Sequence, residues 1–436
     1  MELFILGVAL TIELTLAVYA LITRNTRSRI KSWTRISMFL GFAVLVVSKV
    51  IVWHAAWGLF AGLLLILAVK EIVILLRKRI SAYPRSVFSA LLKSVLLAFA
   101  VFVTLIPVLL FPQHRSPQAT GPYPVNTATY TYTDLDRTEE FADEEKQRSV
   151  NVEFWYPELA NANDTYPLLV FSHGAFGIKT SNDSTFTELA SHGYVVVSID
   201  HPYHSFYTVS DSGEVVTINP QYMREVNEAN REGAYSLEEF FELTQKWIKL
   251  RTDNMNFVID TVLEQAEQKS DPIYGRIDTQ KIGVFGHSMG GAASVGLSRE
   301  RYDIGAAVNI DAPFFSEIRY DPAADDLVAK SEPYTIPLLN VYSDDVWVQL
   351  DSSSAYVANR ISNPAFADAY TVHFEGAKHL SLTDLPLYSP FLANMLQGGR
   401  ADIDKYTVIE TQNELILQFF DYALKQQGSF DPRKTY

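Results

Sequence analysis

The segment Lys281–Gly291, with the sequence KIGVFGHSMGG, is the feature that most constrains the fold of this chain. Its apolar first half predicts a buried strand, and the Ala-rich run Ala292–Arg299 predicts a helix. The G-x-S-x-G pattern between them predicts a sharp turn that tolerates no bulky side chain two residues before or after the serine. Since the N-terminal N–H groups of such a helix point at developing negative charge, Ser288 is the candidate nucleophile.

Four apolar segments are long enough to cross a bilayer, and they predict a transmembrane region over residues 1–111. The segments are Leu3–Ile22, Ile36–Ala55, Gly58–Leu76 and Val87–Phe111. Residues 1–111 carry 12 Lys/Arg and 3 Asp/Glu, whereas the remaining 325 residues carry 24 and 47. The second region is therefore acidic, and it lacks the basic balance that nucleic-acid binding requires.

Basic residues in two of the loops predict the orientation of the four segments. The first loop holds Arg24, Arg27, Arg29, Lys31 and Arg35, and the third holds Arg77, Lys78, Arg79 and Arg85. Because cytoplasmic loops are enriched in Lys and Arg, both loops are expected inside the cell. The N-terminus and everything after Phe111 are then extracytoplasmic, and the absence of cysteine agrees with an exported domain.

Two charged residues, Glu13 and Lys49, fall within the predicted spans. A charge at membrane depth is costly and usually faces a partner or a cavity, so these two are candidates to pair with each other. Lys70 and Glu71 lie nearer the cytoplasmic end and are interpreted as structural. Pro107 is expected to kink the fourth span.

Beyond the spans, we expect a Pro-rich linker over residues 112–129 and a catalytic domain over residues 130–436. The linker holds four prolines with polar spacers, which favours an extended and semi-rigid chain. Apolar runs that alternate with helical patterns then predict a mostly parallel sheet covered by helices on both faces, an α/β class. The predicted strands are Ser149–Tyr156, Leu168–Phe171, Tyr194–Ile199, Ile304–Ile310, Pro337–Tyr342 and Tyr370–Phe374. The predicted helices are Thr185–His192, Ser236–Glu267 and Thr407–Lys425.

A Gly-rich loop, SHGAFG, follows the strand Leu168–Phe171 directly. The tetrahedral oxyanion of acyl transfer is best met by two backbone N–H groups, one after the nucleophile and one from a loop of this kind. These groups are assigned to Met289 and Ala175. The alternative for HGAFG is a plain turn, which its combination with the Ser288 turn makes the weaker reading.

The remaining members of a triad are sought just after strands, where α/β sheets place their sites. Asp311 follows the strand Ile304–Ile310 and His379 follows Tyr370–Phe374, which gives the order Ser, Asp, His of an α/β hydrolase. Asp344 and Asp345, after the next strand, occupy the commoner position of the acid in this fold. The choice between Asp311 and Asp344 therefore stays open on these grounds. The triad requires no cofactor and no metal.

Five segments together resemble the plasma type of platelet-activating factor acetylhydrolase and its bacterial relatives, over about residues 150–385. The segments are FSHGAFG, LASHGYVVVSIDH, GHSMGGA, NIDAPFF and FEGAKH. The resemblance implies an α/β-hydrolase fold, favours Asp311 as the acid, and matches Ala175 and Met289 as oxyanion donors. It also implies a metal-independent serine hydrolase of short or oxidised acyl esters, including phospholipid sn-2 esters.

Two other functions remain compatible with these residues. The elbow GHSMGG also recurs in cutinase-like polyesterases, so the substrate does not follow from it. A catalytically silent membrane sensor or scaffold, in which the domain only binds a ligand, is the alternative from a different class. A complete triad with an oxyanion loop favours an enzyme acting on an ester or phospholipid.

Overall fold

The computed structural model describes residues 2–23, 29–77, 87–142, 145–158, 164–231, 233–269, 271–360, 366 and 368–436. Its contacts divide the chain into two units. The helical unit comprises Met1–Arg115 with Tyr388–Leu392, and the sheet unit comprises Ser116–Leu387 with Ala393–Tyr436. Each unit has its own buried apolar core.

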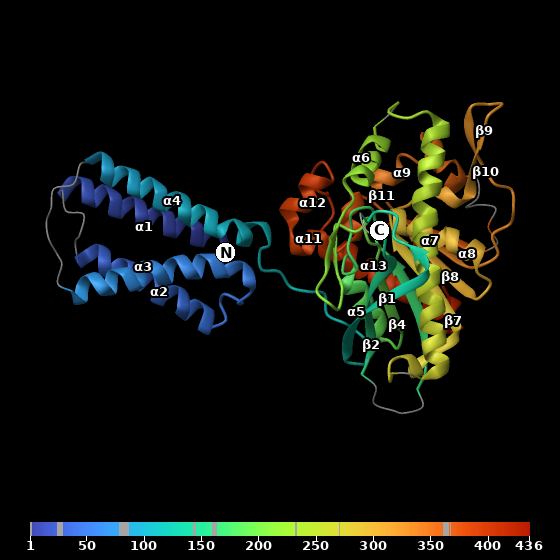
Figure 1. Cartoon of the computed structure of the whole chain (residues 1–436), viewed down its shortest axis with the longest axis horizontal. Helices are drawn as coiled ribbons and strands as arrows, with labels where there is room; N and C mark the ends of the chain where they lie inside the picture. Colours follow the sequence, from blue (N-terminus) through green and yellow to red (C-terminus); the bar gives the residue numbers. More distant parts are fainter. Residues whose placement is uncertain are drawn as a thin grey trace. The chain divides into compact units, whose positions relative to one another are not determined.

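The helical unit contains, within the described residues, four helices that are long and apolar enough to cross a membrane (Figure 1). They are α1 (Glu2–Thr23), α2 (Arg29–Val47), α3 (Gly58–Leu76) and α4 (Val87–Leu110). The second helix begins and ends earlier than expected, at Arg29 and Val47. It ends early because the chain turns at Lys49, whose φ is 57°. A short 3-10 helix, η1 (Ala55–Trp57), follows. The loop charges Arg24, Arg27, Lys78, Arg79 and Arg85, which carry most of the orientation argument, lie outside the described residues.

A buried polar cluster joins three of these helices, and it corrects the expected pairing of Glu13 with Lys49. Arg35 on α2 donates from Nε and a terminal nitrogen to Glu13 on α1, at 3.0 and 2.7 Å. Its other terminal nitrogen lies 3.2 Å from Glu71 on α3, which also accepts from Ser32 at 2.8 Å. The forked guanidinium can reach carboxylates on two helices at once. Lys49, in contrast, lies beyond the end of α2 and is exposed.

The sheet unit is built on one large sheet, of eight strands in the described residues, in the order β1-β2-β4-β3-β7-β8-β11-β12. These strands are β1 (Val125–Thr138), β2 (Gln147–Pro157), β3 (Tyr166–Ser172), β4 (Val195–Asp200), β7 (Ile277–His287), β8 (Ile304–Ile310), β11 (Leu338–Ser343) and β12 (Ala369–Phe374). The six strands from β4 to β12 pair in parallel, while β1 and β2 are antiparallel to their neighbours. The expectation of a mostly parallel sheet is confirmed.

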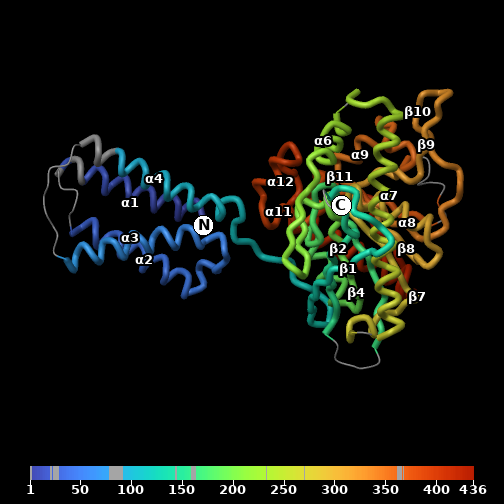
Figure 2. Tube along the Cα trace, in the orientation of Figure 1, coloured from blue at the N-terminus to red at the C-terminus, as the bar shows by residue number. Residues whose placement is uncertain are grey.

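Helices cover both faces of this sheet, as alternation along the strands requires. Phe171 and Phe285 pack with α5 (Asp183–Ser191) and α13 (Lys405–Ala423). Val170 and Val284, one residue earlier on the same strands, pack on the opposite face with α7 (Leu237–Gln268) and α8 (Met289–Glu300). Figure 2 traces the long α7 beside α8. The smaller helices are α6 (Pro220–Ala229), α9 (Asp344–Trp347), α11 (Leu385–Tyr388) and α12 (Pro390–Leu396).

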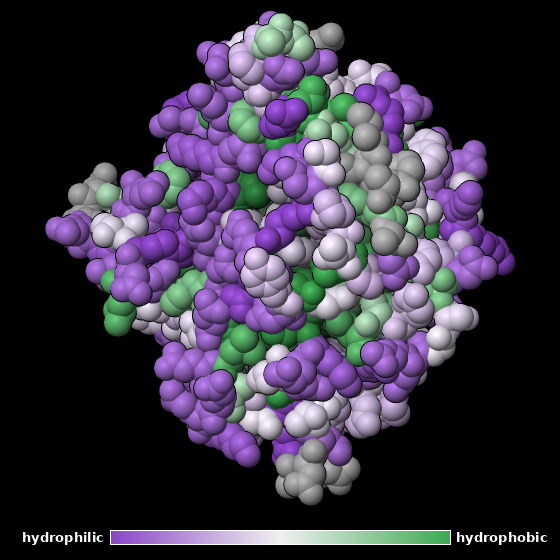
Figure 3. All heavy atoms as spheres, turned by 90° about the vertical axis from the view of Figure 1, so that its right-hand side faces the viewer, coloured by the Kyte–Doolittle hydropathy of each residue, from purple (hydrophilic) through white to green (hydrophobic). Residues whose placement is uncertain are grey.

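The described residues of the sheet unit also form two short hairpins and four 3-10 turns. The hairpins pair β5 (Tyr207–Val209) with β6 (Val215–Thr217) and β9 (Ile318–Asp321) with β10 (Asp326–Ala329). The turns are η2 (Tyr274–Arg276), η3 (Phe315–Glu317), η4 (Ser354–Tyr356) and η5 (His379–Leu382). The face shown in Figure 3 is mostly hydrophilic, which agrees with the acidic composition of residues after 111.

The segment 112–129, for which an extended and semi-rigid linker is expected, belongs in part to the sheet unit. Strand β1 begins at Val125, inside the expected range 112–129. Before it, the backbone N–H of Thr120 donates to Glu188 at 2.8 Å, and that of Gly121 donates to the Ser191 hydroxyl at 3.1 Å. A Cβ at Gly121 would lie 2.1 Å from the Ser191 carbonyl oxygen, so only glycine fits there. The second half of the segment is thus docked on α5.

Candidate active site

Ser288 stands at a strained turn between β7 and α8. Its φ of 53° and ψ of −127° lie outside the regions that L-residues normally occupy. A Cβ on Gly286 would come within 2.3 Å of the Gly290 backbone, and one on Gly290 within 1.8 Å of the Ser172 carbonyl oxygen. Glycine is therefore required on both sides of the serine. The Ser288 side chain makes no capping hydrogen bond to α8.

Asp311 and His379 lie together at the carboxyl edge of the sheet. Asp311 follows β8, is 1% exposed, and has a φ of 59°. Its Oδ2 lies 2.7 Å from Nδ1 of His379, at the start of η5. Nδ1 donates a hydrogen bond to the Asp311 carboxylate, so the proton of the neutral imidazole is on Nδ1. Nε2 then keeps the lone pair that a general base needs.

Ser343, at the end of β11, also binds the Asp311 carboxylate. Its backbone N–H donates to Oδ1 at 2.7 Å, and its hydroxyl donates to Oδ2 at 2.6 Å. With His379 this makes three hydrogen-bond partners around one buried carboxylate. Sequence reasoning missed Ser343, although its place directly after a buried strand and next to Asp344 was an available signal.

The competing carboxylates, Asp344 and Asp345, have other partners. Asp344 lies 2.5 Å from Nε2 of His373 and accepts the Gly376 N–H at 2.6 Å. Asp345 accepts the backbone N–H of His379 at 2.9 Å and lies 3.2 Å from the Lys378 ammonium. Both therefore support the loop that carries His379, while the imidazole itself contacts Asp311.

His287, directly before the serine, packs against His379, with ring centroids 4.5 Å apart. Its Nε2 lies 3.0 Å from the His379 carbonyl oxygen, and burial lowers its pKa well below the ordinary value, so the ring is neutral and donates this bond. In the described part of the chain, the one cluster spaced to hold a metal ion is His287, Asp311 and His379. Two of its ring nitrogens are already engaged in the bonds given above, and the prediction that no metal is needed stays a prediction.

The Gly-rich loop after β3 lies against the serine turn. A Cβ on Gly174 would be 2.9 Å from Nδ1 of His287 and 3.2 Å from Cβ of Ser288. The next residue, Ala175, is half-buried, and Met289 is the first residue of α8. The first N–H groups of a helix have no partner within it, so the Met289 N–H suits an anion. The structure thus brings together the segments of all five predicted site residues.

Arg251 is a second residue that the sequence reasoning missed. It lies on the core face of α7, four residues from both Trp247 and Met255, and none of its surface is exposed. The neighbouring Leu250 is only partly buried. The guanidinium reaches the Gly-rich loop, donating to the carbonyl oxygens of His173 and Gly174. Arginine at a core position of helical spacing was the signal.

Comparisons with known proteins point to one family. The family model described as platelet-activating factor acetylhydrolase, isoform II, matches residues 147–434. The platelet-activating factor acetylhydrolase of Bos taurus is 22% identical over 293 residues, which are 64% of this chain and 61% of that protein. The corresponding protein of Gallus gallus is 25% identical over 300 residues, 63% of this chain and 67% of that protein. The chain therefore spans only about three fifths of the Bos taurus protein.

Similarity also extends to other esterases. Cutinase est2 of Thermobifida alba is 24% identical over 216 residues, 47% of this chain and 57% of that protein. The solved structure of a ferulic acid esterase from Streptomyces cinnamoneus superimposes with a TM-score of 0.56 at 19% identity, covering 73% of this chain and 96% of that chain. The structural likeness bears on the fold alone, which is the α/β-hydrolase fold.

Proposed function

We propose that this chain, which belongs to the family of platelet-activating factor acetylhydrolase, isoform II, is a membrane-anchored enzyme that hydrolyses carboxylic esters with Ser288. The family and its relatives are carboxylic ester hydrolases. The observation that carries the proposal is the 2.7 Å contact between Asp311 and His379 beside a serine held at a strained turn. A binding-only domain would need neither feature.

The reaction begins with a proton transfer from the Ser288 hydroxyl to Nε2 of His379, while the serine oxygen forms a bond to the ester carbonyl carbon. Asp311 keeps the imidazole in the correct tautomer and stabilises the imidazolium. The carbonyl oxygen becomes an oxyanion, to which the N–H groups of Ala175 and Met289 donate hydrogen bonds. The bond to the leaving alcohol then breaks, and His379 returns the proton to that alcohol.

The second half of the reaction repeats these steps with water. His379 takes a proton from a water molecule, whose oxygen attacks the acyl carbon, and the same two N–H groups hold the second oxyanion. The bond to Ser288 breaks, the serine recovers its proton, and the carboxylic acid leaves. Every step uses groups of this chain and water, so the proposed mechanism needs no cofactor.

The substrate class proposed is a short or oxidised acyl ester, with phospholipid sn-2 esters included. Support comes from the family match and from four apolar helices that would keep the enzyme at a lipid surface. The similarity to Cutinase est2 favours a second candidate, a polyesterase. Hydrolysis rates on p-nitrophenyl esters of graded acyl length, on an sn-2 acetyl phospholipid and on a polyester film would separate the two.

The catalytic domain is proposed to lie outside the cytoplasm, on the basis of the loop charges. Protease added to intact cells should release a soluble, active hydrolase by cutting near residues 112–119, ahead of the docked Thr120. If the domain is cut only after the membrane is opened, the orientation is the reverse.

The nucleophile is tested with a fluorophosphonate probe on the full chain in detergent. Ser288→Ala should abolish labelling and lower ester turnover by at least about 10⁴-fold, because the covalent step is lost. The exposed Ser352→Ala serves as the matched control and should keep both. Labelling that survives in Ser288→Ala would remove Ser288 from the mechanism.

A further inference from the structure

Arg251 is a buried cation that no carboxylate neutralises among the ion pairs of the described residues. It has no exposed surface, and burial lowers the pKa of its guanidinium from the ordinary value. Taking a charge out of water is expensive unless it is paired or richly hydrogen-bonded. A core position on α7 could hold an apolar side chain at no such cost. The arginine is therefore placed for what it contacts.

Besides an interaction with the side chain of Tyr222, its contacts are concentrated on one short stretch, residues 172–174. One terminal nitrogen donates to the His173 carbonyl oxygen and lies 3.3 Å from the Ser172 hydroxyl. The other donates to the Gly174 carbonyl oxygen at 3.3 Å. The two prongs of the guanidinium thus hold consecutive carbonyl groups of the loop that leads to Ala175, an arrangement that one point-like ammonium could not reproduce.

The Gly174 carbonyl has two further donors, the backbone N–H of Gly177 at 3.1 Å and the imidazole of His173. Nδ1 of that ring lies 2.6 Å from the Gly174 oxygen, and Nε2 lies 2.7 Å from the Ser205 hydroxyl. The Gly174 carbonyl oxygen can only accept a hydrogen bond, so Nδ1 must be its donor, and Nε2 of the neutral ring accepts from the Ser205 hydroxyl. The proton of His173 is therefore on Nδ1. Burial lowers the pKa of His173 well below the ordinary value, so the ring is a neutral donor.

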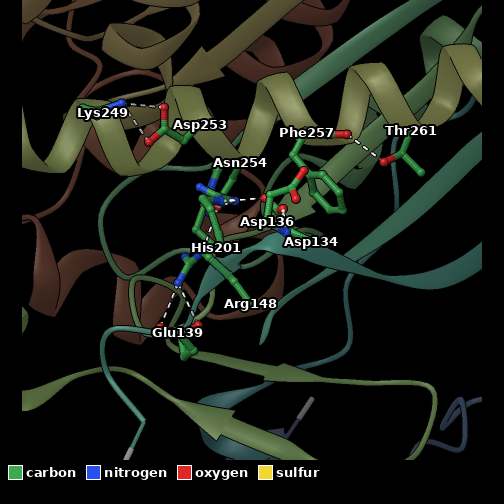
Figure 4. Close-up of polar contacts among 11 residues, drawn as sticks. Asp134, Asp136, Glu139, Arg148, His201, Lys249, Asp253, Asn254, Phe257 and Thr261 are labelled. Atoms are coloured by element: carbon green, nitrogen blue, oxygen red, sulfur yellow. Dashed lines mark hydrogen bonds and ion pairs between the residues drawn. The ribbon is translucent and has the colours of Figure 1, made fainter. Parts of the chain in front are cut away.

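A chain of hydrogen bonds runs from Arg148 through Asn254 and His201 toward the Ser172 hydroxyl (Figure 4). Arg148, paired with Glu139 at 2.8 Å, donates to Asn254 at 2.9 Å. The Asn254 amide donates to Nδ1 of His201 at 3.0 Å, so Nε2 of His201 carries the proton and donates to the Ser172 hydroxyl at 2.8 Å. The polar groups around Ser172 are thereby oriented one way only, and Arg251 meets a prearranged set of acceptors.

The Gly174 carbonyl and the Ala175 N–H belong to the same peptide group. That group is planar and trans, so its N–H points opposite to its C=O. Arg251, which lies on α7, draws the oxygen toward that helix and thereby directs the Ala175 N–H away from it. A cation on the carbonyl also polarises the peptide and strengthens its N–H as a donor. Both effects act on one of the two proposed oxyanion donors.

We propose that Arg251 is a positioning residue of the oxyanion hole, which holds and polarises the Gly174–Ala175 peptide so that the Ala175 N–H is aimed at the developing oxyanion. The proposal rests on the proposed function. Because an oxyanion exists only in the transition state and the tetrahedral intermediate, Arg251 should affect turnover and not substrate binding. A purely structural arginine would alter stability without that selectivity.

The test compares Arg251→Met, Arg251→Lys and the wild type as full chains in detergent, with p-nitrophenyl acetate. Loss of a whole oxyanion donor costs about 10²- to 10³-fold in kcat, so the loss of its support should cost about 10- to 100-fold. KM should stay within about twofold. The affinity for a trifluoromethyl ketone, which forms a tetrahedral adduct with the serine, should fall by the same factor as kcat. Arg251→Lys keeps the charge but not the fork, and should fall between the other two.

Arg301→Met, which removes an arginine that pairs with Asp260 and Asp303 at the surface, is the control and should keep the wild-type kcat. The proposal would be overturned if Arg251→Met kept the wild-type kcat. It would also be overturned if kcat fell together with the melting temperature while the affinity for the ketone stayed unchanged. If Arg251→Met does not fold, Arg251→Lys is read by the same criteria. A wild type without Ser288-dependent hydrolysis would instead overturn the proposed function.

Discussion

Both units of this molecule bury arginines, and Arg35 and Arg251 are held in opposite ways. Arg35 in the helical unit contacts two carboxylates, Glu13 and Glu71, on two other helices. Arg251 in the sheet unit contacts carbonyl oxygens of one loop. The charge of Arg35 is neutralised by the two carboxylates, and the cluster joins three helices. The charge of Arg251 is paired with no carboxylate among the described ion pairs, so its electric field polarises the peptide groups that it contacts.

Two buried acids of the sheet unit resemble Arg251, because neutral hydrogen-bonding groups hold them and no countercharge does so among the described residues. Asp311 is met by the N–H and hydroxyl of Ser343 and by the imidazole of His379. Asp384 is met by the N–H and hydroxyl of Ser184, at 2.7 and 2.6 Å. Charges held by dipoles remain available to a reaction or to a proton, whereas charges held by countercharges chiefly fix geometry. Three substitutions test whether this difference is real.

The largest expected effect is at Asp311. Asp311→Asn cannot hold the required tautomer of His379, and such a loss typically costs about 10⁴-fold in turnover. Asp344→Asn, which alters a carboxylate bound to His373, should leave most of the activity. Turnover of p-nitrophenyl acetate by both proteins, each shown to be folded by circular dichroism, decides between them. A dead Asp344→Asn beside an active Asp311→Asn would assign the acid to the later strand.

A second effect is expected at Arg35, and on assembly alone. Arg35→Met leaves Glu13 and Glu71 buried without their cation, which should destabilise the helical unit by about 3–5 kcal/mol. Replacing all three by Gln, Met and Gln should restore much of that loss. Thermal unfolding of the full chain in detergent measures both, and the exposed Lys49→Met is the control. A fall in kcat without a fall in stability would mean that this cluster also acts in catalysis.

The smallest effect concerns Asp384 and pH. Burial raises its pKa from 3.8 to about 7. Since the folded pKa exceeds the unfolded one, this group favours the folded state only while protonated, and its ionisation lowers the unfolding free energy as pH rises from about 4 to about 7. The loss is at most about 4 kcal/mol. Asp384→Asn should raise the melting temperature at pH 8 and change it little at pH 4, relative to the exposed control Asp351→Asn. An equal effect at both pH values would show that the carboxylate does not titrate in this window.

Sequence reasoning reached the features that depend on local pattern. The bounds of α3, the strand and helix around Ser288, and the parallel order of the later strands all follow from periodicity and turn residues. Strand β1 was missed because its residues sit beside a Pro-rich tract whose composition suits a linker equally well. Its identity as a strand depends on pairing with β2, which no local pattern encodes.

The side-chain partners were the harder part. Glu13 and Lys49 were expected to pair because they have opposite charges and both fall within predicted spans. The packing of α1, α2 and α3 instead places Arg35 between two glutamates. Arg251 and Ser343 were missed for a related reason. Each acts through a residue distant in the chain, Gly174 and Asp311 respectively, so that its role appears only when the sheet places them together.

The strand order also bears on how the protein is made. Strand β3 pairs on one side with β7, and their ends at Ser172 and His287 are 115 positions apart. At about 5–20 residues per second of synthesis, one edge of β3 waits on the order of ten seconds for its partner. Every residue of β3 is buried in the finished sheet. During synthesis this apolar, unpaired edge is a site for aggregation, so a nascent chain of this topology depends on protection until residue 287 has emerged.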